Sequence, residues 1–181
     1  EAVLALVNKG LAMDLDEVAA AKLAFYEKHG APDTFEHADL YAKCLSVMKT
    51  QLYSPEEKFD SIWSTPDRLP HKSLWLWDSV FHALGHRRIS GDLAEQLIHA
   101  IWAHQGENGY VPHMANSVLA SSITQPPVIA WGSWHVYKTT GNKEFLKEVF
   151  EHNKAFLNWC REYRRVSDKE LYTWETTNDV N

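Results

Sequence analysis

The spacing of apolar residues is the feature that most constrains the fold of this chain. Along most of its 181 residues, apolar side chains recur at steps of three and four, which places them on one face of an α-helix. The pattern predicts six helices, over residues 16–28, 35–52, 78–88, 90–101, 126–141 and 143–164. No set of alternating segments supports a sheet, so we expect an all-α fold.

Boundary residues support these helices. Gly30 and Gly141 are typical C-terminal stops, and Ser90 is a typical N-terminal start. Pro126 and Pro127 are expected in the first turn of the fifth helix, where a missing backbone N–H costs little. Three other prolines fall within residues 54–73, which excludes a continuous helix there and predicts a structured loop with a short strand near 59–63.

The connections between the predicted helices alternate between short turns and long loops. In an array of helical hairpins, the short turns lie at one end and the long loops gather at the other. The three loop segments rich in aromatic and polar residues are 63–78, 106–125 and 171–181. We therefore expect these segments to meet at one rim, where binding sites are usually built.

Composition limits the classes of partner. The chain has 24 acidic and 18 basic residues, a formal net charge of −6, which gives no basic footprint for nucleic acid or an anionic membrane. No apolar run approaches the ~20 residues of a membrane span, and no signal peptide is visible, so a cytoplasmic location is favoured. Cys44 and Cys160 are expected to be buried free thiols rather than a disulfide.

Aromatic residues are unusually frequent, with eight Trp, seven Tyr and seven Phe. An indole face can cover the C–H face of a sugar ring while its N–H donates a hydrogen bond. A core filled with tryptophan explains the same composition, and composition alone favours that explanation.

The stretch "HKSLWLWDSVFHALGHRR" places Asp78 directly after Trp75 and Trp77. A carboxylate beside two indoles is costly to desolvate unless it is hydrogen-bonded. Asp78 could be a helix N-cap, or it could accept hydroxyl groups of a sugar stacked on a tryptophan, and both roles can hold together. His82 and His86 share a helix face, but without a third ligand they are a weak signal for a metal, and we expect none.

Two carboxylates near Trp174 are candidates for acid catalysis. Glycoside hydrolysis requires two carboxyl groups on opposite sides of the scissile bond, one of them protonated. Glu175 and Asp179 are each spaced so that either could be the acid.

Four segments, "TPDRLPHKSLWLWDSVFHALG", "NGYVPHM", "SSITQPPVIAW" and "LYTWET", together resemble bacterial members of glycoside hydrolase family 63, in particular mannosylglycerate and glucosylglycerate hydrolase-like proteins. More distantly they resemble trehalases and processing α-glucosidases. The resemblance covers residues 35–181 and implies helical hairpins that form about half of an (α/α)6 barrel, with residues 1–34 as a preceding helix and 1–181 as a single domain. It also implies cleavage of α-glycosides with inversion and no cofactor.

The resemblance further implies individual roles. Trp75, Trp77 and Asp78 would line the subsite for the released sugar, and His113 and Gln125 would bind the substrate. The family has W-E-S-G-M-D before its general acid, and the segment from Trp174 to Asp179 matches its first two and last residues, so Trp174 would bind substrate and Asp179 would be the acid.

The family's general base lies in the second half of the barrel, and no residue here matches it. We therefore expect an incomplete catalytic domain that is inactive alone and self-associates through an exposed half-barrel seam. A non-catalytic helical module that binds carbohydrate or a protein is the alternative function.

Overall fold

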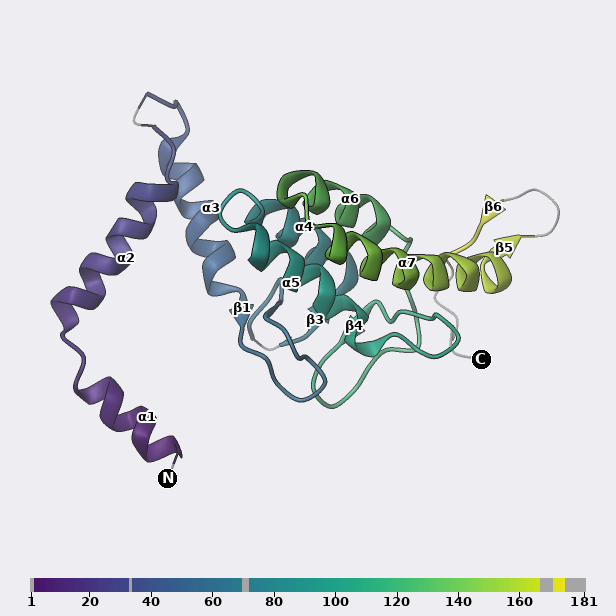
Figure 1. Cartoon of the computed structure of the whole chain (residues 1–181), viewed down its shortest axis with the longest axis horizontal. Coiled ribbons are helices and arrows are strands. Elements are labelled where there is room, and N and C mark those ends of the chain that lie inside the picture. Colours follow the sequence, from purple (N-terminus) through teal and green to yellow (C-terminus); the bar gives the residue numbers. More distant parts are fainter. Residues whose placement is uncertain (1, 33, 70–71, 167–170, 175–181) are drawn as a thin grey trace. The chain divides into compact units, whose positions relative to one another are not determined.

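The computed structural model describes residues 2–32, 34–69, 72–166 and 171–174. The chain divides into two compact units, Glu1–Lys49 and Thr50–Asn181 (Figure 1). The single domain expected over 1–181 stays a prediction.

The first unit is helical. It contains α1 (Ala2–Leu11), α2 (Leu15–His29) and all but the end of α3 (Ala38–Thr50). The carboxylate of Asp14 caps α2 by accepting hydrogen bonds from the N–H groups of Asp16 and Glu17 at 2.8 and 3.3 Å. The N–H of Gly30 donates to Tyr26 O at the other end, which confirms the predicted stop at Gly30, and the helix is one residue longer at each end than the predicted 16–28.

The second unit is built on four helices: α4 (Leu76–His86), α5 (Gly91–Ile101), α6 (Ile129–Thr140) and α7 (Lys143–Tyr163). A short 3₁₀ helix, Trp102–His104, extends α5. Ser90 and Asn142 cap the N-termini of α5 and α7 through their side-chain oxygens. Gly141 ends α6 at φ 67°, a left-handed conformation that glycine adopts without steric cost.

Helix packing in the second unit follows the predicted hairpins. Helix α4 packs on α5 and α6, and α6 packs on α5 and α7 (Figure 1). The core between them is aliphatic and aromatic; its largest fully buried side chains include Trp63, Trp159, Phe59, Phe156, Leu76 and Leu97. Tryptophan is therefore part of the core, as composition suggested, although Trp131 and Trp134 of α6 are about half exposed.

Strands are short in the described part of the chain. They form three antiparallel pairs of two residues each: β1 (Leu52–Tyr53) with β2 (Trp63–Ser64), β3 (Leu74–Trp75) with β4 (Met114–Ala115), and β5 (Arg165–Val166) with β6 (Leu171–Tyr172). Such short pairs hold neighbouring loops together, and they are too small to form a sheet layer of the fold. The all-α class is confirmed.

Several predicted boundaries were wrong. Helix α3 covers Ala38–Thr50 instead of 35–52, because Leu52 pairs in a strand with Ser64. The strand expected over 59–63 begins only at Trp63. Helix α1 was not among the predicted helices.

Two chemical expectations also changed. Helix α4 begins at Leu76 and Trp75 occupies its N-cap position, so Asp78 is not an N-cap. Cys44 and Cys160 are both free, as expected, but Cys44 is exposed and only Cys160 is buried. Among the described helices, none combines the length and the apolar character needed to cross a membrane.

Candidate functional site

The strand pair β3–β4 joins the first two of the three segments of the predicted rim, 63–78 and 106–125. Leu74 is paired with Ala115 and Trp75 with Met114, and the N–H of Leu76 donates to His113 O at 2.9 Å. This pairing brings the "WLWD" segment against the "VPHM" segment, although almost 40 residues separate them in the sequence. The predicted meeting of 63–78 with 106–125 is confirmed.

The indole of Trp75 lies against the imidazole of His113. Their ring centroids are 5.2 Å apart and the rings meet edge to face at 72°. Trp75 is half-buried, and its Nε1–H is buried with no hydrogen-bond acceptor among the described residues. A buried donor of this kind calls for an acceptor, which a bound ligand can supply.

A short hydrogen-bond network holds His113. Nδ1 of His113 lies 2.6 Å from Ser121 Oγ and 3.1 Å from Ile123 O. Because the carbonyl of Ile123 can only accept, the tautomer that satisfies its 3.1 Å contact with His113 carries the ring proton on Nδ1. In the neutral ring, Nε2 is then the acceptor. The hydroxyl of Tyr110 lies 2.8 Å from Ser121 O and 2.9 Å from Ile123 O, and its single proton, shared between these two carbonyls, holds the loop behind this network.

Trp77 is tied to the start of α6. Its backbone N–H donates to Gln125 Oε1 at 3.1 Å, and its indole Nε1–H donates to Pro126 O at 2.8 Å. The carbonyl of Pro126 also accepts the N–H of Val128. Since that carbonyl is used outside the helix, α6 begins at Ile129, and the expected placement of Pro126 and Pro127 in its first turn was wrong. Because Trp77 uses the side-chain oxygen of Gln125, the two amide N–H groups of Gln125 are the donors that it can offer a ligand.

Asp78 lies in the first turn of α4 and is half-buried. A negative charge in a first turn is favoured by the helix dipole, which offsets part of the cost of lying beside two indoles. One turn later, burial lowers the pKa of His82, and the Asp78 carboxylate acts against that shift. His82 Nδ1 lies 2.8 Å from Ser64 Oγ.

Trp174 borders a hollow beside Pro126. The hollow is about 330 Å³ and is walled by Pro126, Pro127, Leu157, Tyr172 and Trp174, with Cys160 and Arg161 on α7. The rings of Tyr172 and Trp174 are stacked at 6.5 Å. Burial raises the pKa of the Cys160 thiol to about 12, so this cysteine is no nucleophile near neutral pH. Thus the described start of the third rim segment shares this hollow with Pro126, whose carbonyl binds Trp77.

Most of the predicted site residues lie close together. Trp75, Trp77, His113 and Gln125 are brought together, Asp78 follows them on α4, and Trp174 lines a hollow together with Pro126. Glu175 and Asp179 lie outside the described residues. The sequence interpretation missed Tyr110 and Ser121, because a residue that acts by bonding backbone carbonyls leaves no pattern of its own. The roles of all these residues stay predictions.

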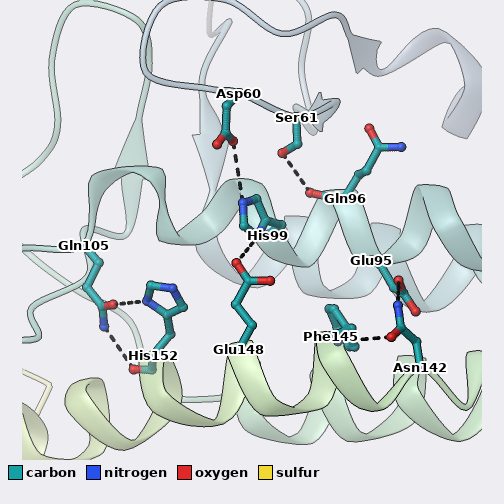
Figure 2. Close-up of polar contacts among 10 residues, drawn as sticks. All are labelled: Asp60, Ser61, Glu95, Gln96, His99, Gln105, Asn142, Phe145, Glu148 and His152. Carbon is teal, nitrogen blue, oxygen red and sulfur yellow. Dashed lines mark hydrogen bonds and ion pairs between the residues drawn. The ribbon is translucent and has the colours of Figure 1, made fainter.

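A second polar cluster lies between α5, α7 and the loop before β2 (Figure 2). His99 stands between two carboxylates, with Nδ1 at 3.1 Å from Glu148 and Nε2 at 3.7 Å from Asp60. On the same side of the unit, His152 Nδ1 lies 2.6 Å from Gln105 Oε1. These contacts fasten α5 to α7. Over the described residues, no group of three or more His, Cys, Asp or Glu side chains has the arrangement of a metal site.

Comparison with known protein families identifies the family of this chain. Residues 70–179 match the model of the mannosylglycerate hydrolase MGH1-like glycoside hydrolase domain. The chain belongs to this family. The match contains the β3 segment, the His113 loop and Gln125, so the geometry described above lies inside the family domain.

Solved structures share the fold. One is a GH63 mannosylglycerate hydrolase from Thermus thermophilus, in complex with Tris and D-glycerate, at 25% identity and a TM-score of 0.53. Another is an uncharacterized conserved protein from the same organism, at 25% identity and a TM-score of 0.57. Each comparison covers 67% of this chain and 32% of the other, so the chain spans about a third of these structures. A search of curated proteins finds no match.

These neighbours confirm the predicted family and the predicted fold. The all-α fold is that of a partial (α/α) barrel of the GH63 type.

Proposed function

We propose that this chain forms the sugar-binding part of an inverting α-glycoside hydrolase and that its substrate is a small α-glucoside or α-mannoside. The observation that carries the proposal is the convergence of Trp75, Trp77, His113 and Gln125 at the start of α4, held by the β3–β4 pair and by the hydrogen bonds of Trp77. A sugar site requires an aromatic face surrounded by hydroxyl-binding groups, and these residues supply both.

Each of these side chains keeps a donor, an acceptor or a ring face that its contacts within the chain leave available to a sugar. Trp77 has committed its N–H to Pro126, so it offers only its ring face. Trp75 has a buried donor that suits a sugar oxygen. Nε2 of His113 accepts a hydroxyl proton, and the amide group of Gln125 donates to a hydroxyl oxygen. Asp78 accepts hydroxyl groups and, in the transition state, faces positive charge that develops on the sugar ring.

Catalysis needs two more carboxyl groups. In an inverting enzyme, an acid protonates the leaving oxygen while a base activates water about 6.5–9.5 Å away. Asp179 is the acid in this proposal and Trp174 supports the leaving group. The base comes from outside this chain, so the 181 residues bind sugars without hydrolysing them.

Calorimetry with a neutral sugar and its protonated iminosugar analogue tests the site. A cation that resembles the transition state should bind at least tenfold tighter than glucose or mannose, and Asp78→Asn should remove that preference. Trp75→Ala should abolish binding of both ligands, whereas Trp134→Ala, an exposed tryptophan of α6, should leave both unchanged. Equal affinity for the neutral and cationic ligands would instead favour the non-catalytic carbohydrate-binding module.

Turnover of an aryl α-glucoside or α-mannoside tests the incompleteness of the catalytic domain. We expect no release of the aryl group by the chain alone. Release that is lost in Asp179→Asn would contradict an external base, and NMR of the first-formed anomer would then show whether the reaction inverts.

A further inference from the structure

Four donor atoms surround the backbone carbonyl of Ile123, beside the candidate sugar site. Its oxygen lies 2.8 Å from the backbone nitrogen of His113 and 3.1 Å from Nδ1 of the same residue. Ser121 Oγ and the hydroxyl of Tyr110 each lie 2.9 Å from it. A carbonyl oxygen has two lone pairs, so it cannot bind all four donors fully. The way in which the neighbouring acceptors share these protons therefore decides which ring nitrogen of His113 is protonated.

The hydroxyl of Ser121 is fully used when Nδ1 of His113 carries the ring proton. Its oxygen lies 2.6 Å from Nδ1 and 3.4 Å from the backbone nitrogen of Met114, so its two lone pairs accept these two N–H groups. Its own proton is then free for Ile123 O at 2.9 Å. In the opposite arrangement, in which Ser121 donates to Nδ1, the lone pairs of Nδ1 and Ile123 O face each other at 3.1 Å. The contacts therefore favour a proton on Nδ1.

The backbone around Ser121 keeps this hydroxyl in place. The N–H of Ser121 donates to Met114 O at 2.9 Å, and Ser121 O lies 2.8 Å from the hydroxyl of Tyr110. Gly109, which precedes Tyr110, has a φ of 91° and touches α7, since a Cβ atom there would lie 2.4 Å from Ala155 O. The loop that carries Ser121 is thus tied to α7 through Tyr110. Because the hydroxyl is tied to a helix, it can hold the imidazole beside it in one orientation.

The other nitrogen of the ring, Nε2 of His113, is then a hydrogen-bond acceptor for a ligand. The indole of Trp75 lies edge to face against the same ring, at 5.2 Å between centroids, and its Nε1–H is a buried donor without an acceptor among the described residues. The two neighbouring rings therefore offer a ligand one acceptor and one donor. A hydroxyl group matches such a pair because it both donates and accepts, whereas a fluorine atom only accepts and an ammonium group only donates.

We propose that Ser121 is a positioning residue: it holds the ring proton of His113 on Nδ1 and so makes Nε2 an acceptor for a sugar hydroxyl that also binds Trp75. Ser121 itself does not touch the sugar. Without its hydroxyl, the ring keeps the longer contact to Ile123 alone, and the proton can move to Nε2, where it would meet the sugar hydroxyl as a second donor. The recognition of a hydroxyl rests on the proposed function, whereas the tautomer exists without a ligand.

NMR of the imidazole nitrogens tests the tautomer on the chain without ligand, at about pH 9, well above the ordinary imidazole pKa of about 6.5. The signal of His113 is identified by its loss in His113→Gln. The wild-type ring should have a protonated Nδ1 and a bare Nε2. Ser121→Ala should raise the fraction protonated on Nε2 by about twofold or more. Ser121→Thr, which keeps the hydroxyl, and Ser117→Ala, a serine of the same loop outside this network, should leave it unchanged.

Calorimetry with methyl α-glucoside, methyl α-mannoside and their monodeoxy and monodeoxyfluoro analogues tests the recognition. At one ring position, both the deoxy and the fluoro analogue should bind the wild-type chain about tenfold more weakly than the parent sugar, because neither can donate to Nε2 of His113. Ser121→Ala should bind the parent sugar about tenfold more weakly and should reduce that preference, and Ser121→Thr should restore both.

Three results would overturn the inference. A wild-type His113 protonated on Nε2 contradicts the tautomer. Ring nitrogens that are unchanged in Ser121→Ala exclude Ser121 as the residue that sets it. Fluoro analogues that bind as well as the parent sugar at every ring position exclude a hydroxyl that donates to His113. A chain that binds none of these sugars contradicts the proposed function, and the recognition of a hydroxyl falls with it, while the NMR result still decides the role of Ser121.

Discussion

Gly132 holds α6 close enough to α4 to position the rim. A Cβ atom at this residue would lie 2.4 Å from Cγ1 of Val80 and 3.7 Å from Cδ1 of Ile98. Ordinary carbon contacts are about 3.5–4.0 Å, and Val80 is fully buried, so it has no free space into which to move. Gly132→Ala must therefore push α6 away from α4 or force Val80 out of its rotamer.

The magnitude follows from two opposing effects. Overpacking a core costs about 1–3 kcal/mol, and an overlap of more than about 1 Å against a fixed side chain belongs at the upper end. Replacing glycine by alanine within a helix returns about 1 kcal/mol. We expect Gly132→Ala to lose about 2 kcal/mol and to lower the melting temperature by about 8 °C in a unit of this size.

A double-mutant cycle tests the contact itself. Val80→Ala alone should cost about 2–3 kcal/mol through lost burial and a cavity. In the Gly132→Ala, Val80→Ala double variant the new methyl group occupies part of that cavity, so the double loss should be smaller than the sum by about 1–2 kcal/mol. Urea unfolding measures all three variants. Additive losses, or a Gly132→Ala variant as stable as the wild type, would refute the close approach of the helices.

Three further predictions concern stability. Trp77→Phe removes the donor to Pro126 O and should cost about 1 kcal/mol in urea unfolding, while Trp134→Phe, on an exposed surface, should cost nothing measurable. Asn142→Ala removes the cap of α7 and a 2.8 Å bond to Glu95 and should cost about 1–2 kcal/mol; Asn142→Ser, which keeps a capping oxygen, should lose less, and equal losses would contradict a capping role. Burial lowers the pKa of His82 and of His152, so between the folded pKa and the ordinary value of about 6.5 the unfolded chain binds more protons. The free energy of unfolding should therefore fall as the pH is lowered below about 6.5, and His82→Asn should reduce this dependence; a chain whose stability is unchanged between neutral and mildly acidic pH would contradict the shifts.

The sequence predicts the helices well where local signals decide them. The stops of α2 at Gly30 and of α6 at Gly141 involve contacts within four residues, so their positions can be read from the chain alone. The start of α6 fails for the opposite reason. Its boundary is set by the carbonyl of Pro126, which is bound by an indole 49 residues earlier. Helix periodicity contains no information about that partner.

The candidate site also has features that the sequence predicts and features that it does not. The meeting of its long loops follows from the alternation of short and long connections, and the resemblance to a family names Trp75, His113 and Gln125. The register of Leu74 against Ala115 does not follow from either, because two-residue strands have no alternation to read. Hence the sequence indicates which side chains gather but not which atoms they have available.

The available atoms exclude one of the two interpretations of Asp78, the helix cap. A carboxylate that capped α4 would use its oxygens on backbone N–H groups and would have little left for a ligand. Because the helix begins two residues earlier, Asp78 lies in the first turn, where the dipole favours its charge without using its oxygens as a cap. The position beside Trp75 and Trp77 is then tolerable for a charged group whose oxygens stay available, and the proposed function requires this of a residue that faces a cationic transition state.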